Sequence, residues 1–280
     1  MRIIRKEILA RYNQIRIILL EIDAPEISKK ALPGQFVVLM VKREGERIPL
    51  TIVDKNIQKG TITLIFQEVG LTTRLLGKLD CGDSLYALVG PLGRPTEIKN
   101  YGEVIIIGGG VGIAEIYPVA GAFKKEGNFV FTILGARTKE LLILEERLRE
   151  ISDEFYITTD DGTYGRKGFV SDVLEEILNS KLKDEKFQLI YAVGPISMMR
   201  RVSEITKPYN IKTVVSLNAL MVDATGMCGC CRVNIAGEIR FSCVDGPEFD
   251  AHLVDWENLL KRNSMYLEKE KHICNLLLEK

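Results

Sequence analysis

Four side chains near the C-terminus have the types and the spacing of a metal site. Asp223, Cys228, Cys231 and Cys243 follow the pattern D-x4-C-x2-C-x11-C in a glycine-rich stretch. Plant-type two-iron clusters are held by C-x4-C-x2-C and a distant fourth cysteine, so the spacing fits a 2Fe–2S cluster if Asp223 takes the first ligand position. A carboxylate can bind iron, and its harder oxygen should change the reduction potential relative to a thiolate.

The same donors leave other interpretations open. Three thiolates and one further ligand also suit a closed tetrahedral zinc site, and buried free cysteines without a ligand are the third possibility. Cys230 is the spare cysteine under the x4 and x2 spacing, and we expect it to point away from the iron. A shifted set that uses Cys230 remains an alternative. The clustering of four of the six cysteines favours metal or redox chemistry over disulfides.

A glycine-rich turn marks a second candidate site, at the end of a buried apolar strand. The sequence VIIIGGGVGIAEIYP places between strand and helix the residues Gly108, Gly109, Gly110, Val111 and Gly112. Glycines let the backbone approach a pyrophosphate, and a helix N-terminus offers free N–H groups and the positive end of its dipole. The common G-x-G-x-x-G pattern fails because Ile113 occupies its last position. The turn indicates a nucleotide site, with a ligand-free tight turn as the alternative.

Two later turns bear on the same site. The strand after the glycine turn ends in Gly135-Ala136-Arg137-Thr138, without the acidic residue expected about 20 residues on. Another strand ends in Gly194 and Pro195. Turns at the carboxyl ends of parallel strands form the crevice where such sheets bind ligands. Arg137 suits a 2′-phosphate, so the residues alone leave NAD and NADP open.

The elements that must position these residues fall into three parts. Residues 1–98 contain short β-branched strands separated by turn residues, which predicts a small antiparallel barrel. Residues 99–217 alternate strands with helices, which predicts a parallel sheet covered on both faces. Residues 218–280 are rich in Gly and Cys and end in one or two amphipathic helices. The predicted fold class is multidomain α+β: barrel, α/β nucleotide domain and a small C-terminal cluster region.

Two segments within residues 1–98 contain candidate residues for binding a phosphate-bearing cofactor. RIPLT and QEVGLTT contribute Arg47, Pro49, Leu50, Thr51, Gln67, Gly70, Thr72 and Thr73. An arginine with nearby hydroxyls and a glycine turn can hold a phosphate and a ribityl chain. An exposed arginine and ordinary turn threonines are the alternative.

A barrel followed by a nucleotide sheet with a GGGxGIA turn resembles the ferredoxin reductase family of flavoproteins, in which a flavin on the barrel faces a nicotinamide on the sheet. The resemblance implies FAD, held by a segment near the family's Arg-x-Tyr-Ser motif and by a pyrophosphate turn at Gly70, Thr72 and Thr73. Arg47 precedes Thr51 by four positions rather than three, and Leu50 replaces the aromatic residue. Leu50 therefore cannot stack as a tyrosine would.

With the two-iron site at the C-terminus, the chain resembles the electron-transfer subunits of dihydroorotate dehydrogenases. A closer resemblance is to the small subunits of NADH-dependent reduced ferredoxin:NADP oxidoreductases, carried by GERIPLTI, QEVGLTT, GPLGRP, IGGGVGIAEIYP, VGPISMM, MVDATGMCGCCRV and CVDGPEFDAHLVDW. Asp223 and the last of these segments favour this second family. The dihydroorotate-linked role remains the alternative.

The closer resemblance implies an oxidoreductase subunit that exchanges hydride with NAD(H) through FAD and passes single electrons through a 2Fe–2S cluster. It also implies a heterodimer whose large subunit carries a second flavin, four-iron clusters and the NADP(H) site, with ferredoxin as a partner in electron bifurcation. Cofactor chemistry of this kind requires positioning rather than a side chain acting as general acid or base. We expect structural or surface roles for His252 and His272.

Composition excludes several other classes. Lys and Arg total 38, as do Asp and Glu, so the formal net charge is zero and the basic excess of a nucleic-acid-binding protein is missing. No run reaches the roughly 18 apolar residues of a membrane span. Charged residues interrupt the N-terminal apolar stretch, unlike a signal peptide. We therefore expect a cytoplasmic protein without nucleic-acid or membrane partners.

Overall fold

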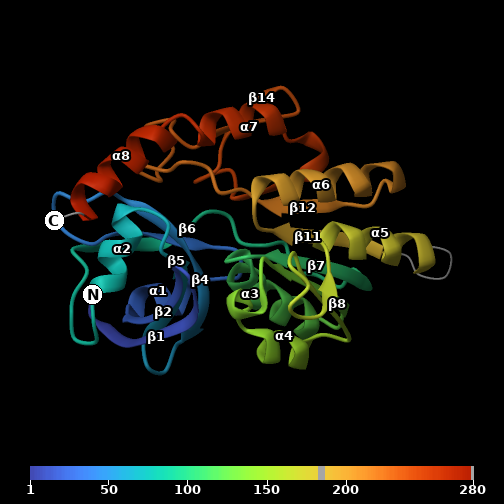
Figure 1. The fold of residues 1–280 in the computed structure, drawn as a ribbon, viewed down its shortest axis with the longest axis horizontal. Helices are drawn as coiled ribbons and strands as arrows, with labels where there is room; N and C mark the ends of the chain where they lie inside the picture. Colours follow the sequence, from blue (N-terminus) through green and yellow to red (C-terminus); the bar gives the residue numbers. More distant parts are fainter. Residues whose placement is uncertain (182–186, 279–280) are drawn as a thin grey trace. The chain divides into compact units, whose positions relative to one another are not determined.

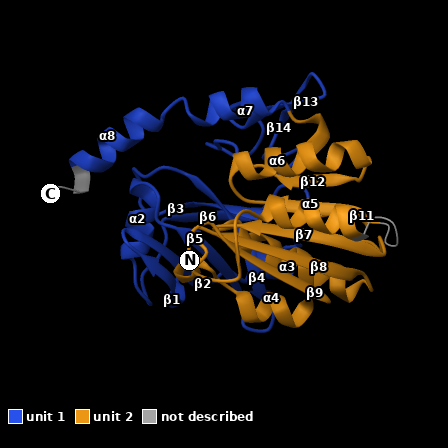
Figure 2. Cartoon of the chain, turned by 45° about the vertical axis from the view of Figure 1, so that its right-hand side comes forward, with its two compact units in different colours: residues 1–94, 218–247, 255–280 blue, residues 95–217, 248–254 orange. Residues whose placement is uncertain are grey.

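The computed structural model describes residues 1–181 and 187–278, which form two compact units. The first unit combines residues 1–94, 218–247 and 255–280, and the second combines residues 95–217 and 248–254 (Figure 2). The cysteine segment thus belongs to the same compact unit as the N-terminal strands. The three-part division predicted from the sequence remains a prediction.

The first unit contains a six-stranded antiparallel sheet, as predicted. Its strands are β1 (Ile3–Tyr12), β2 (Ile15–Asp23), β3 (Phe36–Met40), β4 (Ile48–Asn56), β5 (Thr61–Gln67) and β6 (Ala87–Leu92), in the order β1-β2-β5-β4-β3-β6. The Ile3 N–H donates to the Asp83 carbonyl, and the Gly82 N–H donates to the Ile3 carbonyl, both at 2.9 Å. These bonds join β1 to the segment before β6, so the sheet closes into a barrel around a core of buried aliphatic residues.

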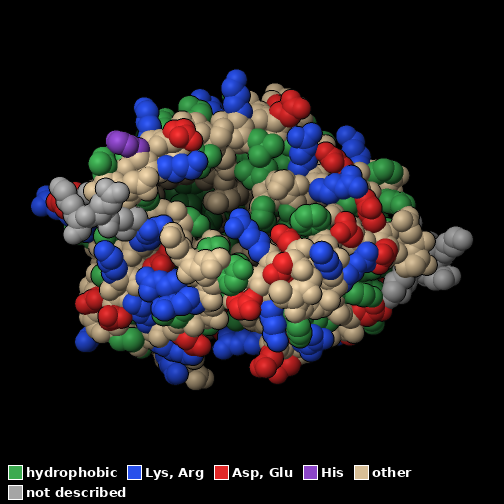
Figure 3. Space-filling model, in the orientation of Figure 1, with side chains coloured by type: hydrophobic (Ala, Val, Ile, Leu, Met, Phe, Trp, Pro, Cys, Tyr) green, Lys and Arg blue, Asp and Glu red, His purple; other side chains and the backbone are tan. Residues whose placement is uncertain are grey.

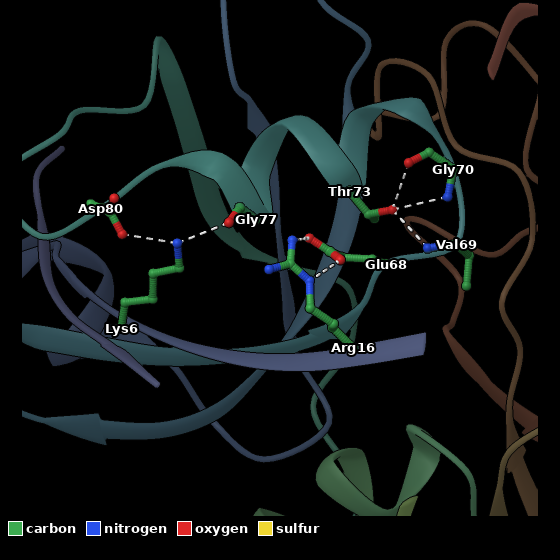
Figure 4. Close-up of polar contacts among 8 residues, drawn as sticks. All are labelled: Lys6, Arg16, Glu68, Val69, Gly70, Thr73, Gly77 and Asp80. Carbon is green, nitrogen blue, oxygen red and sulfur yellow. Dashed lines mark hydrogen bonds and ion pairs between the residues drawn. The ribbon is translucent and has the colours of Figure 1, made fainter. Parts of the chain in front are cut away.

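Two helices belong to the barrel, α1 (Pro25–Lys30) and α2 (Leu71–Lys78). An ion pair holds the segment that leads into α2: Arg16 Nε and Nη2 each donate to a Glu68 carboxylate oxygen at 2.6 Å (Figure 4). The Glu68 side chain is 6% exposed and that of Arg16 31%. This pairing fixes the end of β5 against β2 and so determines where α2 begins.

The second unit is a seven-stranded sheet (Figure 1). Its strands, in the order β10-β9-β8-β7-β11-β12-β15, are β7 (Glu103–Gly109), β8 (Phe129–Ala136), β9 (Glu154–Thr159), β10 (Arg166–Lys167), β11 (Phe187–Val193), β12 (Thr213–Ser216) and β15 (Glu248–Asp250). All neighbours pair in parallel except β15, which runs antiparallel to β12. The predicted parallel sheet is confirmed, with one added edge strand from residues expected in the C-terminal region.

Helices cover both faces of this sheet. They are α3 (Gly112–Lys125), α4 (Glu145–Ile151), α5 (Val170–Lys181) and α6 (Ile196–Thr206), with 3₁₀ turns at Lys139–Leu141, Lys207–Tyr209 and Ala251–Leu253. Right-handed crossovers from β7 through β8 to β9 put α3 and α4 on one face. The chain then returns past β7 to β11 and β12, which puts α5 and α6 on the other face (Figure 1).

The C-terminal region contributes a hairpin and two helices to the first unit. Strands β13 (Arg232–Ile235) and β14 (Glu238–Phe241) pair antiparallel, and α7 (Trp256–Asn263) and α8 (Leu267–Leu278) follow. The Asp255 carboxylate caps α7 by accepting the Asn258 N–H at 3.0 Å. None of the helices in the described ranges has the length and apolar character needed to cross a bilayer. Basic and acidic side chains are interspersed over the face seen in Figure 3.

The Arg16–Glu68 pair generates a stability prediction. Glu68→Gln removes the charge that compensates Arg16 in a nearly buried position. We expect the free energy of unfolding to fall by about 2 kcal/mol, below the roughly 3–5 kcal/mol of a fully buried pair because Arg16 keeps contact with solvent. Urea unfolding of the two proteins measures the difference. The control is Glu26→Gln, which breaks the exposed Lys29–Glu26 pair and should change stability by less than about 0.5 kcal/mol. Equal losses in the two variants would contradict the prediction.

Candidate cofactor and cluster sites

The β13–β14 hairpin brings two of the predicted metal ligands together. Cys231 directly precedes β13 and Cys243 follows β14 by one residue, and both are buried. Their Sγ atoms lie 3.2 Å apart, and the Cys243 N–H donates to the Cys231 Sγ at 3.4 Å. Two cysteines separated by eleven residues therefore converge because the strands between them fold back on each other.

Asp223 organises the loop that carries the other two cysteines. Its Oδ1 accepts the Thr225 N–H and its Oδ2 accepts the Cys228 N–H, both at 2.9 Å. The bond from Thr225 is the main reason that the pKa of Asp223 is lowered. Cys228 is exposed, and its Sγ accepts the Cys230 N–H at 3.5 Å. Asp223 thus has a structural role in this loop in addition to the ligand role predicted for it.

Arg94 and Arg262, which the sequence analysis did not single out, hold the segment in place. The Arg94 N–H donates to the Gly246 carbonyl at 2.7 Å, and its Nε donates to the Val244 carbonyl at 3.2 Å. Arg262 on α7 donates to the Cys230 carbonyl at 3.0 Å. Arg94 belongs to the GPLGRP stretch after β6, so the chain just beyond Cys243 is bound to the end of the barrel.

The donor chemistry of this segment fits a two-iron cluster. Four protein ligands on two irons give two ligands per iron, which suits a contacting thiol pair such as Cys231 and Cys243. Backbone N–H groups already point at two of the sulfurs, as they do around iron–sulfur clusters. Burial raises the pKa of Cys243 to about 12, so metal binding must release its proton. Among the described residues no group of three or more potential ligands is close enough together to hold a single metal ion.

The predicted flavin residues lie at the start of β4 and the start of α2. Arg47 directly precedes β4, is exposed, and forms no ion pair or hydrogen bond within the described ranges. Pro49, Leu50 and Thr51 lie half-buried in β4, and the half-buried Gln67 ends β5. The guanidinium of Arg47 is therefore available for an anionic ligand.

The start of α2 offers a cradle for a phosphate. Thr73 Oγ1 accepts the N–H groups of Val69 and Gly70 at 3.0 Å and donates to the Gly70 carbonyl at 3.1 Å, so it caps the helix (Figure 4). The space beside Gly70 is open, since a Cβ there would have no neighbour within 4 Å. Free N–H groups in the first turn of a helix attract anions. These residues fit the pyrophosphate of a dinucleotide.

Glu46 is a participant that the sequence analysis missed. The Thr72 hydroxyl donates to Glu46 Oε2 at 2.5 Å. This bond brings the residue next to Arg47 within hydrogen-bonding reach of the first turn of α2, so the two predicted flavin segments do meet. A phosphate at this turn would compete with the Glu46 carboxylate for the Thr72 hydroxyl.

In the second unit, the two predicted glycine turns meet at the carboxyl edge of the sheet. Gly108 and Gly109 end β7, and Gly112 begins α3 against the end of β11, where a Cβ would lie 2.5 Å from the Val193 carbonyl oxygen. A Cβ on Gly194 would lie 3.1 Å from the Gly109 Cα, and Pro195 is the N-cap of α6. Only glycine allows these backbones to approach so closely.

The open side of this turn is at Gly110 and Val111. Gly110 has φ +57° and donates its N–H to the Gly135 carbonyl at 2.8 Å, while nothing lies within 4 Å of its Cβ position. Val111 is the N-cap of α3. The N-terminus of α3, with the positive end of its dipole, therefore adjoins free space, which fits a nucleotide pyrophosphate. Arg137 is exposed at the same edge, directly after β8.

Neither histidine is among the candidate ligands of the cluster, the flavin or the nucleotide. The His252 Nε2 lies 2.9 Å from the Thr206 hydroxyl at the end of α6, and burial is the main cause that lowers its pKa. His272 is exposed on α8. Both positions agree with the structural or surface roles expected from the sequence.

Comparison with protein families matches two segments of the chain. Residues 218–255 match the iron-sulfur cluster binding domain of dihydroorotate dehydrogenase B, and residues 106–204 match the oxidoreductase NAD-binding domain. The first segment contains all the predicted metal ligands, and the second contains the glycine turns and Arg137.

Several known proteins resemble the chain over most of its length. A Thermotoga maritima homologue of the dihydroorotate dehydrogenase B (NAD(+)) electron transfer subunit is 48% identical over 89% of this chain and 87% of its own. A probable electron transfer subunit of the same name from Pyrococcus furiosus is 38% identical over 78% of each chain. A solved structure of the NADH-dependent reduced ferredoxin-NADP oxidoreductase, studied for flavin-based electron bifurcation, superposes with a TM-score of 0.92 at 44% identity, covering 100% of this chain and 98% of that one.

The ligand set of the cluster can be tested with variants of Asp223 and Cys230. Asp223→Cys restores four thiolates, so it should assemble a cluster with a shifted reduction potential and a shifted electron paramagnetic resonance spectrum. Asp223→Ala should lose iron because a donor and the loop contacts to Thr225 and Cys228 are both removed. Cys230→Ser is the control and should keep the iron content and spectrum. If Cys230→Ser loses the cluster while Asp223→Ala keeps the native spectrum, the set is Cys228, Cys230, Cys231 and Cys243.

The role of Arg47 can be tested separately. Arg47→Ala should weaken FAD binding by about 10- to 100-fold, the value of a charge-assisted hydrogen bond, with the iron content unchanged. Flavin retained after dialysis measures the effect. The matched control is Arg43→Ala, an exposed arginine of the same loop, which should retain flavin like the native chain. Full retention in Arg47→Ala would make Arg47 an ordinary surface residue.

Proposed function

Because this chain belongs to the family of dihydroorotate dehydrogenase B electron-transfer subunits and their homologues, we propose that it is the small subunit of an electron-bifurcating NADH-dependent reduced ferredoxin:NADP oxidoreductase. It is an oxidoreductase with an NAD-binding domain, an iron–sulfur domain and the flavin-binding ferredoxin reductase-like fold. What we propose beyond this family membership is the complex in which the chain works.

The observation that carries this assignment is the similarity to the NADH-dependent reduced ferredoxin-NADP oxidoreductase structure. That similarity extends over 100% of the chain at 44% identity. It therefore includes the cysteine segment and the C-terminal helices as well as the more widespread barrel and NAD-binding sheet. Likeness to reductases such as the Amycolatopsis cytochrome P450 reductase, at 24% identity over 75% of the chain, supports only the fold.

The chain's own residues supply positioning and charge. When bound, a flavin exchanges hydride with nicotinamide and single electrons with an iron–sulfur cluster. We assign the flavin pyrophosphate to Arg47, Gly70 and the first turn of α2. We assign the pyrophosphate of NAD(H) to the open turn at Gly110 and Val111, where the α3 N-terminus favours negative charge.

The cysteine segment would hold the one-electron carrier. Asp223 and Cys228 on the loop, with Cys231 and Cys243 at the hairpin, are the proposed ligands of the 2Fe–2S cluster. The Arg94 and Arg262 bonds to backbone carbonyls keep this segment fixed when the charge of the cluster changes. Rigid surroundings reduce the reorganisation that accompanies electron transfer. We propose that the electrons pass to a large subunit with a second flavin, four-iron clusters and an NADP(H) site, and through that complex to ferredoxin.

A second candidate has its own support. The relatives from Thermotoga maritima and Pyrococcus furiosus carry names that refer to dihydroorotate dehydrogenase B. In that case the electrons would come from dihydroorotate oxidation in a different partner subunit, while the barrel, the NAD-binding sheet and the cysteine segment would work in the same way. The partner, rather than this chain, distinguishes the two functions.

Purification of the tagged chain from its native cell tests the proposal. We expect a large polypeptide with flavin and four-iron clusters to co-purify, and the complex to couple NADH to ferredoxin and NADP. A dihydroorotate-oxidising partner would establish the alternative instead. For the isolated chain, NADH should bleach the visible flavin absorbance. Reduction by NADPH alone would overturn the assignment of NAD(H) to this subunit.

A further inference from the structure

Two arginines donate hydrogen bonds to the short loop that carries the cysteines. Arg232 Nη1 donates to the Gly229 carbonyl at 3.1 Å, and Arg262 Nη2 donates to the Cys230 carbonyl at 3.0 Å. Arg232 begins β13 and Arg262 lies on α7, so two separate elements place guanidinium groups against consecutive carbonyls of one loop. Both carbonyls lie between the second and the third of the proposed cluster ligands.

The bond from Arg232 is linked to a ligand sulfur through a single peptide group. Arg232 donates to the oxygen of the peptide that joins Gly229 to Cys230. The N–H of the same peptide donates to the Cys228 Sγ at 3.5 Å. A positive charge on the oxygen side of a peptide polarises it and strengthens the hydrogen bond that its N–H donates. Arg232 therefore makes the N–H that faces the Cys228 sulfur more positive.

Arg262 occupies the equivalent place on the next peptide. Its partner, the Cys230 carbonyl, shares a peptide with the N–H of Cys231. Cys231 is buried, and its Sγ lies 3.2 Å from the Sγ of Cys243. The half-buried Arg262 side chain thus brings a positive charge to the peptide that leads into the contacting thiol pair.

Neither guanidinium is neutralised by a carboxylate. Within the described ranges Arg232 and Arg262 form no ion pair. Arg94, which also donates to this segment, differs in this respect because it pairs with Asp245 at 3.6 Å. The two arginines of the ligand loop therefore act on it as uncompensated positive charges.

The two redox states of a cluster respond unequally to such charges. A 2Fe–2S cluster with four anionic protein ligands is dianionic when oxidised, and one added electron makes it more negative. A nearby positive charge therefore stabilises the reduced cluster more than the oxidised one. Hydrogen bonds to the ligand sulfurs act in the same direction, because they draw electron density away from sulfur.

We propose that Arg232 and Arg262 raise the reduction potential of the 2Fe–2S cluster, acting on its ligands through the peptide groups of the loop 228–231. This inference rests on the proposed binding of the cluster by the cysteine segment. It makes the two arginines positioning residues that determine how readily the cluster accepts one electron, in addition to their role in holding the loop.

A redox titration of the full-length chain loaded with FAD and the cluster, followed by electron paramagnetic resonance, tests the proposal. Arg232→Gln and Arg262→Gln each keep an N–H donor but lose the charge. Each should therefore shift the equilibrium toward the oxidised cluster by about three- to tenfold, at ~59 mV per factor of ten for one electron. Arg232→Lys and Arg262→Lys keep the charge and should stay within about twofold of the native chain.

The matched control is Lys261→Gln. Lys261 is the exposed neighbour of Arg262 on α7, and within the described ranges it donates no hydrogen bond to the cysteine loop. The variant removes the same charge from a position where solvent and salt screen it. It should shift the equilibrium by less than about twofold. The iron content of each variant is measured alongside its reduction potential.

The outcomes separate the inference from the proposed function. If the native chain holds neither iron nor the signal of a reduced two-iron cluster, the cluster assignment itself fails. If the native chain carries the cluster and both glutamine variants keep its potential, the arginines do not set that potential although the function stands. Loss of iron from the glutamine variants would make the arginines structural clamps and would also overturn the inference. Equal shifts in the lysine variants or in Lys261→Gln would contradict a role for charge at these two positions.

Discussion

The absence of side chains at the touching turns of the second unit is the constraint on which its site depends. A single methyl group at Gly112 would meet the Val193 carbonyl oxygen at 2.5 Å, and one at Gly109 would meet the Met198 sulfur at 2.4 Å. Because backbone lies against backbone at Gly112, α3 starts directly at the edge of the sheet. A side chain at Gly112 would push the start of α3 away from β11, because its nearest neighbours there are backbone atoms.

The first unit reaches a similar arrangement by different means. At the start of α2 the helix is capped by its own Thr73, and the preceding segment is held by Arg16 and Glu68 (Figure 4). Open space at Gly70 again leaves a helix N-terminus free. Each unit therefore presents the same physical feature, a helix dipole behind a glycine at the end of a strand, and each can neutralise a pyrophosphate without a dedicated lysine.

Local patterns predicted much of the fold. The glycine turns and the apolar run of β7 are encoded over a few consecutive residues, and the structure shows them where expected. Strands β1 and β4 carry weaker local signals, because β1 contains the charged run Arg5-Lys6-Glu7 and a proline lies in β4. Between β8 and β9 the predicted alternation gives a short 3₁₀ turn and then α4, and these are separated by Leu144, which adopts φ +56°. Edge strand β15 was missed because three residues carry too little periodicity to be recognised.

The site residues divide in the same way: local motifs identify some of them, whereas their contacts depend on segments that are distant in the sequence. Motif spacing identified the cysteines, but the contact between Cys231 and Cys243 depends on a hairpin whose turn, at Ala236 and Gly237, has positive φ at both residues. The glycine turns at Gly109 and Gly194 were each recognised in the sequence, but their close approach depends on the pairing of β7 with β11, which no local signal marks. The carboxyl ends of the parallel strands share one edge, and this brings the two turns together. Ligand chemistry at such an edge is a property of neighbouring strands taken together, and the sequence of any one strand describes only part of it.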